Sequence, residues 1–442
     1  MDHHHKHNEQ GKESISLTSA VAMGTGVMIG AGIFALTGQV AELAGPFFPF
    51  AFIVGAIIAG FSAYSYIKMS NAWPSSGGIA MILQKSYGTG AIAAGAALLM
   101  AISMVIAESL VARTFASYVL RPFDITGGPL VPIISVGVIL FAFAVNMAGN
   151  RSVGFLSSIM AVIKIGGISL FAIAALWSSG FQFSANVDSV STFSLTGFIA
   201  SVALTILAFK GFTTITNSGS EITNPHRNIG LAIIISIALC AVVYVLVTFA
   251  VGSSLSIEEI ISAKDYSLAE AAEPALGRTG FYLTIVLAAV ATLSGVLASV
   301  FAVSRMLAMM TDMKMIPHSH FGMSGSIRKH TLVYAVVIAS LLAVFFDIGR
   351  IASLGAFLYI VMDMIIQWGV YRYMRKEISA SSPIILMALT FDAIILTALT
   401  MYKINTDPLI VVYSAVAIVS IFSYERFYLS KWYGKDATET SE

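Results

Sequence analysis

The sequence predicts an all-α protein that crosses a membrane many times. Of its 442 residues, 57% are hydrophobic and only 11% are charged. Such a chain has too little polar surface to cover several water-soluble cores. It also contains twelve apolar stretches, each long enough to cross about 30 Å of hydrocarbon. We therefore expect one membrane domain of twelve transmembrane helices.

The positions of Lys and Arg predict the orientation of the chain, because cytoplasmic loops carry an excess of both. With the amino terminus inside, sixteen of the 24 Lys and Arg residues fall on the inner side and five on the outer side. We expect both termini to be cytoplasmic, in an inner or plasma membrane. The predicted spans are 17–43, 46–69, 90–119, 129–148, 153–178, 194–217, 228–252, 279–309, 331–347, 349–372, 382–402 and 408–428.

Composition also excludes several classes of protein. A net charge of +1 without a long basic tract argues against nucleic-acid binding. The single cysteine, Cys240, allows no internal disulfide and supplies no zinc site. We predict no metal and no cofactor, and we interpret the histidines of the polar tail 1–14 as solvated rather than metal-binding. These are His3, His4, His5 and His7.

The first span contains the segment GTGVMIGAGIF, residues 24–34, with four glycines in nine positions. A helix that only crosses the membrane gains nothing from so much backbone freedom. We therefore predict that this helix opens at 28–32. The opening would expose amide and carbonyl groups able to hold a small polar solute at membrane depth, as in secondary transporters.

A matching interruption is predicted five spans later, as an inverted-repeat transporter requires. Residues 205–221 have the sequence TILAFKGFTTITNSGSE, in which Lys210 and Gly211 interrupt an apolar run. We predict a break at 208–212. The alternative is that Gly211 only lets two helices pack closely, as small residues often do in membranes.

Together these segments resemble the amino acid, polyamine and organocation (APC) superfamily. PSSGGI (74–79), FKGFTTITNSGSEITNPHRNIGLAI (209–233) and SRMLAMMTDMKMIP (304–317) resemble further motifs of that superfamily. The resemblance implies a five-plus-five inverted repeat with discontinuous helices 1 and 6, two C-terminal helices and alternating access. The parts of the chain would be a tail at 1–14, repeat halves at 15–178 and 194–375, two more spans at 382–428 and a tail at 429–442.

The resemblance also implies a substrate site at the two breaks. A substrate carboxylate would meet amides of span 1, and a substrate ammonium would meet carbonyls released by both breaks. Phe209 and Phe212 would close the pocket, unless they are packing or lipid-facing aromatics. The amides would be those of Gly30, Ala31, Gly32 and Ile33, and the carbonyls those of Val27, Met28, Leu207 and Ala208.

Lys164 lies in the middle of an apolar span, where an unpaired charge costs at least about 2.5 kcal/mol. Its position resembles that of a lysine in proton-coupled relatives, with the carbonyl of Gly26 and the hydroxyl of Ser294 as its implied partners. Alternating dry and wet surroundings could then load and unload its proton. A fixed structural cation and a snorkelling side chain remain alternatives.

Lys210 departs from the superfamily pattern, because relatives usually carry an apolar or small residue beside the substrate. A lysine facing the pocket would favour acidic or non-amino substrates. Alternatively the protein neutralises it, and we predict an ion pair with Glu108 or Asp363, the deep carboxylates on pathway spans. For Asp392 on the eleventh span we expect a hydrogen bond between helices.

We conclude from the sequence that this is no enzyme but a secondary transporter that imports a small amino acid with a proton. Its predicted partners are a small-molecule substrate, a proton and the lipid bilayer, with no prediction of oligomeric state. The alternatives are a carrier of another small ion, such as an organic acid, a polyamine or potassium, and a non-transporting nutrient sensor. A channel is disfavoured because the spans show only isolated polar positions.

Overall fold

The protein is helical throughout the part of the chain that the structure describes. The computed structural model describes residues 15–148, 150–183, 194–313 and 327–439. The predictions for the histidine tail fall outside these ranges. The long helices are α1 (Leu17–Ala44), α2 (Phe48–Ala72), α4 (Ala91–Leu120), α5 (Leu130–Ala148), α6 (Asn150–Ser178), α7 (Leu195–Phe209), α9 (Pro225–Ser254), α11 (Ser267–Asp312), α12 (Ile327–Phe345), α13 (Ile348–Gly369), α14 (Ser382–Thr406) and α15 (Pro408–Glu439).

Each predicted span coincides with one of these long helices over most of its length, except that in the sixth span α7 ends at Phe209. Nine stretches of the described chain are long and apolar enough to cross a membrane. Shorter apolar helices cover Leu17–Gly30, Ile163–Ser178 and His330–Phe345. The prediction of an all-α, multi-pass membrane protein is thus confirmed. The number of twelve crossings stays a prediction.

Two glycines with left-handed backbone set helix boundaries that hydropathy alone places poorly. Gly45 has φ 58° and ends α1, donating its N–H to the carbonyl of Ala41. Gly277 has φ 69° inside α11 and separates its first turns from the membrane-crossing part. A residue with a side chain is disfavoured in this conformation, so these glycines fix the chain direction where the first span ends and where the membrane-crossing part of α11 begins.

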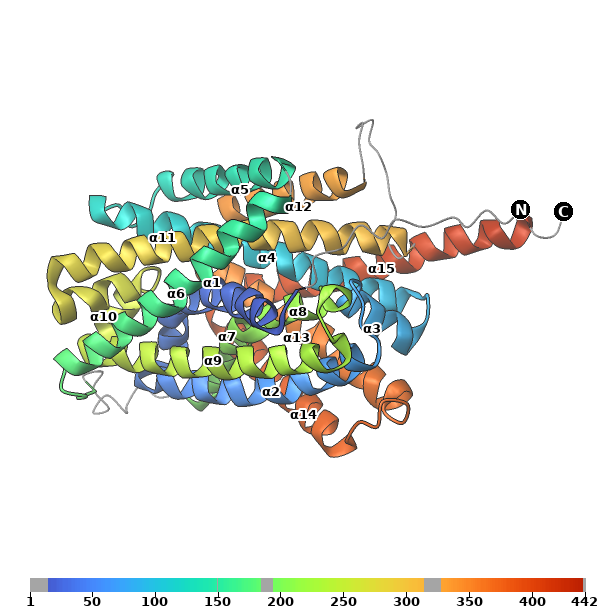
Figure 1. Cartoon of the computed structure of the whole chain (residues 1–442), viewed down its shortest axis with the longest axis horizontal. Helices are drawn as coiled ribbons and strands as arrows, with labels where there is room; N and C mark the ends of the chain where they lie inside the picture. Colours follow the sequence, from blue (N-terminus) through green and yellow to red (C-terminus); the bar gives the residue numbers. More distant parts are fainter. Residues whose placement is uncertain (1–14, 149, 184–193, 314–326, 440–442) are drawn as a thin grey trace, which may run out of the picture.

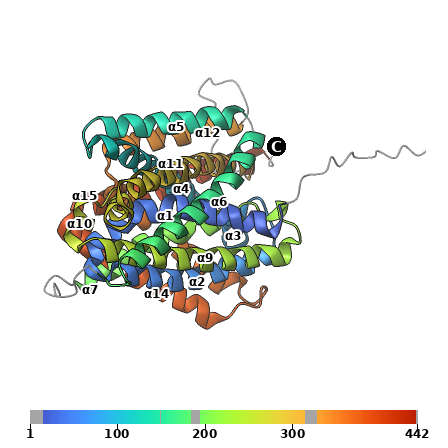
Figure 2. The same cartoon turned by 60° about the vertical axis from the view of Figure 1, so that its left-hand side comes forward.

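The helices form one bundle around α1. Figures 1 and 2 show α1 in the interior, with α5 and α12 side by side at one edge and α2 and α14 at the opposite edge. α1 contacts α6, α7, α9 and α11. α15 projects beyond the other helices (Figure 1). The core helix α1 therefore touches both halves of the chain.

Helix α1 is continuous from Leu17 to Ala44, so the predicted break at 28–32 is wrong. The glycines serve close packing instead. A Cβ on Gly30 would lie 2.9 Å from the carbonyl oxygen of Ala291, and one on Gly32 would lie 2.9 Å from Cβ of Ala208. In apolar surroundings a continuous helix also satisfies its own backbone groups. Both effects favour a closed helix here.

Several short elements join the spans. α10 (Ile257–Ser262) is a short helix that starts with a capping box between Ser256 and Glu259. α3 (Gly78–Tyr87) follows the PSSGGI segment and was not predicted as a helix. The 3-10 turn η4 (Lys210–Phe212) and the single turn α8 (Thr213–Thr216) follow α7.

Candidate substrate and proton site

The helix of the sixth predicted span is interrupted within the predicted range. α7 ends at Phe209, the chain continues through η4, and a helix resumes only for α8. Gly211 lies in this interruption against α1. A Cβ there would lie 2.7 Å from Cγ of Met28 and 3.2 Å from the carbonyl oxygen of Gly24. Gly211 therefore lies in the helix break and also permits close packing against α1. Both interpretations drawn from the sequence apply to it.

The carbonyl groups at the end of α7 have partners within the protein. The carbonyl of Leu207 accepts the backbone N–H of Lys210. The carbonyl of Ala208 accepts the hydroxyl of Tyr244 at 3.3 Å. These two carbonyls, predicted as ligands of a substrate ammonium, are thus occupied in this arrangement by a helix cap and by a tyrosine.

The aromatic residues of the predicted pocket are buried and pack on other rings. Phe209 lies 5.0 Å from Tyr244 between ring centroids, and Phe212 meets Tyr66 edge to face at 5.2 Å. Neither phenylalanine faces lipid.

The predicted residues of α1 lie opposite this interruption. Met28, Gly30 and Ile33 are buried, and Val27 is half-buried. Their amides belong to a continuous helix, so the predicted free amides at Gly30–Ile33 are not present. Ala31 and Gly32 also lie within this continuous helix, and the structure does not describe the side chain of Ala31.

Lys164 is buried on α6 and contacts α1. Its side chain is 3% exposed, and Nζ donates to the carbonyl oxygen of Gly26 at 3.0 Å. A Cβ on Gly30 would lie 3.6 Å from the same Nζ. Lys164 therefore does not snorkel to an interface. Of its two implied partners, Gly26 is within hydrogen-bonding distance.

Ser294 donates its hydroxyl within α11 rather than to Lys164. Its Oγ bonds to the carbonyl of Ala291 at 3.1 Å, the same carbonyl against which Gly30 packs. Lys164 thus lies where α6, α1 and α11 meet, with Ser294 close to that junction but turned to its own helix.

Lys210 binds Ser103 instead of a carboxylate. Its Nζ donates to the backbone oxygen of Ser103 at 2.8 Å and meets the hydroxyl of Ser103 at 3.0 Å. Nζ also lies 5.7 Å from the ring centroid of Tyr359, within cation-π range. Among the described residues no ion pair joins Lys210 to Glu108 or Asp363.

The predicted ion pair of Lys210 is therefore absent from this arrangement, for two geometric reasons. Ser103 and Glu108 are five residues apart on α4, which places them about 140° apart around the helix. Asp363 is already engaged, since its two oxygens accept the hydroxyls of Ser62 at 2.7 Å and Tyr66 at 2.5 Å. Both oxygens of Glu108 are buried without a hydrogen-bond partner in the described chain.

Sequence reasoning missed the polar ladder between α2 and α13. Besides the bonds to Asp363, the hydroxyl of Ser65 donates to Gln367 at 2.5 Å, and Gln367 donates to the carbonyl of Ser62 at 2.9 Å. A signal was present. Residues 62, 65 and 66 are polar at helical spacing on an apolar span, and 363 and 367 match them on another.

Contacts at its two ends hold α1 in place. At its C-terminal end, Lys264 pairs with Glu42 at 2.7 Å, and Gln39 donates to Asp265 at 2.8 Å. Burial raises the pKa of the Asp265 carboxyl. At its N-terminal end, a β-bridge joins Ile15, just before α1, to residue 222. Both ends of α1 are therefore tied to segments from the second half of the chain.

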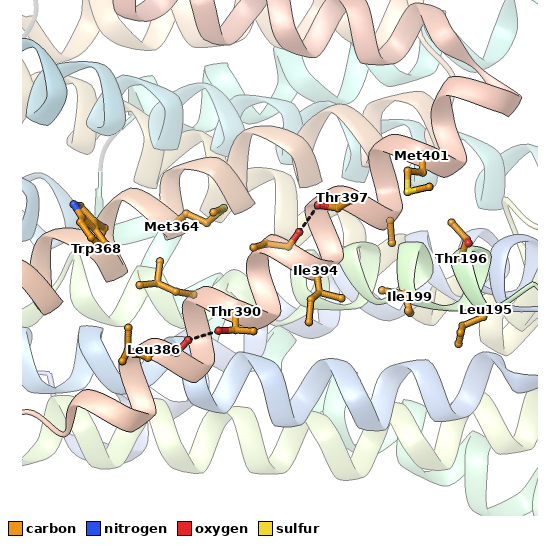
Figure 3. Close-up of a pocket in the computed structure, with 13 residues that line it drawn as sticks. Leu195, Thr196, Ile199, Met364, Trp368, Leu386, Thr390, Ile394, Thr397 and Met401 are labelled. Atoms are coloured by element: carbon orange, nitrogen blue, oxygen red, sulfur yellow. Dashed lines mark hydrogen bonds between the residues drawn. The ribbon is translucent and has the colours of Figure 1, made fainter.

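A separate groove of about 760 Å³ opens on the outer surface between α7, α13 and α14 (Figure 3). Its Thr390 and Thr397 donate to carbonyls of their own helix. Trp368 and Met401 at its rim are half-exposed. None of the predicted site residues lines it, and its apolar walls suit contact with lipid rather than with a polar solute.

The fold and the buried polar centre define a multi-pass membrane protein in which an interrupted helix, a continuous helix and two buried lysines meet. A family model described as amino acid permease matches residues 15–425. The chain therefore belongs to the amino acid permease family, within the APC superfamily, as the resemblance of its motifs indicated. Members of this family are transporters, not enzymes.

Individual relatives agree with the family. The inner membrane transport protein YbaT of Escherichia coli is 28% identical over 383 residues, which cover 85% of this chain and 87% of that protein. The branched-chain amino acid permease BcaP of Lactococcus lactis is 25% identical over 81% of each chain. The methylthioribose transporter of Bacillus subtilis is 28% identical over 53% of this chain and 54% of its own length.

Proposed function

We propose that this permease imports a small amino acid together with a proton, by alternating access across an inner or plasma membrane. Family membership and the amino acid permease among the relatives support the class of substrate. The twelve-span topology with cytoplasmic termini, and the inverted repeat of 15–178 against 194–375, belong to the same proposal.

The observation that carries the proton part of the proposal is the contact of Lys164 with α1. An ammonium has three N–H donors, and in the described chain one acceptor is within reach, the carbonyl of Gly26. The side chain is 3% exposed, so bulk water does not surround this ammonium. A buried ionisable group with so few partners is by default a functional group in a membrane protein.

The same contact would link proton binding to movement. Lys164 is on α6, its acceptor is on α1, and Gly30 presses α1 against α11 one turn further along. Any tilt of α1 relative to α6 therefore breaks or forms this hydrogen bond. Loss of the proton removes an ionic interaction with a carbonyl dipole, so protonation and the position of α1 depend on each other.

We place the substrate at the interruption between α7 and η4, facing Val27, Met28 and Gly32 of α1. Here the helix ends, and carbonyl partners such as the Tyr244 hydroxyl can exchange for a substrate ammonium. Phe209 and Phe212 would then separate the site from the two sides of the membrane.

One observation favours a second candidate, a carrier of organic acids. Lys210 stands in the interruption itself, and Ser103 uses two of its three N–H donors. The remaining N–H donor suits a substrate carboxylate. The positive charge of Lys210 would, however, repel the ammonium group of an amino acid. A substrate with a carboxylate and no amino group would satisfy this geometry.

Uptake into proteoliposomes tests the proposal. Radiolabelled amino acids and organic acids are offered under an imposed proton gradient, and a thermal-shift screen reports binding separately. We expect an amino acid to accumulate, and Lys164→Met to retain binding while losing gradient-driven accumulation. The control is Lys264→Met, which removes a lysine at the outer surface. Accumulation by Lys164→Met would refute the role of Lys164, and no accumulation of any solute by the wild type would refute the carrier.

A further inference from the structure

Two buried carboxyl groups face each other where α13 meets α14. Asp363 and Asp392 are each 1% exposed, and their carboxyl groups lie close enough for each to act electrostatically on the other. The proton-transfer role proposed for Lys164 does not involve them. Two ionised carboxylates in contact away from water repel each other strongly, so the pair requires either a cation or a proton.

Among the described residues no positive group forms an ion pair with either carboxyl group. Asp363 is the charged group that acts on Asp392. The other titratable groups at the site are Tyr66 from α2 and Tyr359 from α13. Lys210 approaches the ring of Tyr359, but its ammonium is held by a serine of α4.

In the part of the chain that the structure describes, the neighbouring helices bring no counter-charge to Asp392. The segment 195–209 of α7 contains no titratable side chain. Glu108 on α4, Arg372 after α13, and Tyr424 and Glu425 on α15 belong to helices that pack on α13 or α14, and none of them acts on Asp392.

The hydrogen bonds distinguish the two carboxyl groups. Both oxygens of Asp363 accept a hydroxyl, from Ser62 and from Tyr66. This pattern fits an ionised carboxylate, which only accepts. In Asp392, Oδ2 is buried and has no hydrogen-bond partner in the described chain. Burying an ionised carboxylate oxygen without a hydrogen-bond partner is costly. The cost is smaller if Asp392 is a neutral acid whose O–H is directed at Asp363.

We propose that Asp363 and Asp392 together bind one proton, carried on Asp392 and donated to the Asp363 carboxylate, as a protonation site separate from Lys164. The pair then has a single negative charge, held by two hydroxyls of α2, the side chain of Gln367 on α13 and the acid O–H of α14. The proton thereby connects α14 to the α2 and α13 helices. Around it α14 packs through apolar contacts such as Phe391 on Phe61, with ring centroids 5.5 Å apart.

The site predicts an asymmetry between two conservative variants. Asp392→Asn places a permanent N–H donor where the acid O–H was, so the folded protein should keep its unfolding temperature near neutral pH. It should also lose the fall in stability that we expect of the wild type as pH rises above the ordinary pKa of an aspartate, where keeping the shared proton becomes increasingly costly. Asp363→Asn has one oxygen for two hydroxyl donors, so its unfolding temperature should shift clearly downward.

Infrared spectroscopy of the purified full-length protein tests the proton directly. The carbonyl stretch of a protonated carboxylic acid is separate from carboxylate bands and shifts in D2O. Glu108 and Glu425 are also buried, with both oxygens of each lacking a hydrogen-bond partner among the described residues, so the experiment uses the double variant Glu108→Gln/Glu425→Gln as the background. There we expect an acid band that Asp392→Asn removes. Persistence of the band in that variant would overturn the proposal. An unchanged unfolding temperature of Asp363→Asn together with a lowered one of Asp392→Asn would also overturn it. Stabilisation of the wild type by Na⁺ or K⁺ relative to choline would also overturn it, because a cation would then occupy the pair.

Discussion

Replacement of Gly30 by alanine tests whether α1 is a continuous helix packed on α11. In the structure the two helices touch at this glycine. A Cβ there would lie 2.9 Å from the carbonyl oxygen of Ala291 and 3.4 Å from Cα of Gly295. These neighbours are backbone atoms of another helix, so no flexible side chain can move aside.

The size of the effect follows from these distances. The Ala291 oxygen is 0.5 Å closer than the 3.4 Å at which ordinary contacts begin, so α1 and α11 must separate. Overpacking of this kind costs about 1–3 kcal/mol. Alanine also favours a helix interior over glycine by about 1 kcal/mol. The net loss should therefore be about 0–2 kcal/mol, with a weakened contact between Lys164 and α1.

Gly60→Ala is the matched control. Gly60 lies inside α2, and a Cβ there would meet nothing within 4 Å. This variant carries the same gain in helix propensity without the clash. The difference in unfolding free energy between the two variants therefore isolates the overpacking, about 1–3 kcal/mol.

The assay is reversible unfolding of both variants in the same detergent, compared with the wild type. We expect Gly30→Ala to be clearly less stable than Gly60→Ala. Equal stability of the two variants would refute the close packing of a continuous α1 on α11.

Three further predictions concern α10 and the residues beside it. Ser256→Ala removes the capping box of α10, so this helix should lose about 1 kcal/mol, measured as faster amide exchange in 257–262; unchanged exchange would contradict it. Asp265→Asn keeps an acceptor for Gln39 but removes a carboxyl whose pKa is raised by burial. A raised pKa means that the fold favours the protonated carboxyl, so the wild type should lose stability as pH rises from the ordinary aspartate pKa to the raised one. The variant should show no such loss. The same dependence of unfolding free energy on pH in both proteins would contradict this prediction. Lys264→Met breaks the pair with Glu42, whose side chains are 37% and 35% exposed, and should cost less than about 1 kcal/mol in thermal unfolding; a larger loss would show that this pair is not surface-screened.

The membrane class, the positions of the spans and the family follow from local features of the sequence. Hydropathy fixed the spans because each must cross the bilayer with satisfied backbone groups, whatever its neighbours are. The break near Lys210 was also visible, since a charge and a glycine interrupt an apolar run. The contact of Lys164 with Gly26 was anticipated through resemblance.

The role of the glycines in span 1 was decided only by the tertiary structure. A glycine-rich helix can open or can pack closely, and the choice depends on what lies against each missing side chain. For Gly30 that is the backbone of Ala291, which is 261 residues away along the chain. No local pattern contains this information.

The partners of the buried charges were also beyond the sequence. Composition showed that Lys210, Asp363 and Asp392 each need a partner, because an isolated charge at this depth is costly. The rotation of each helix about its axis decides which partner is within reach, and packing sets that rotation. Packing turned Lys210 to Ser103 and the two aspartates to each other, so the sequence determined the need for partners and the tertiary structure selected them.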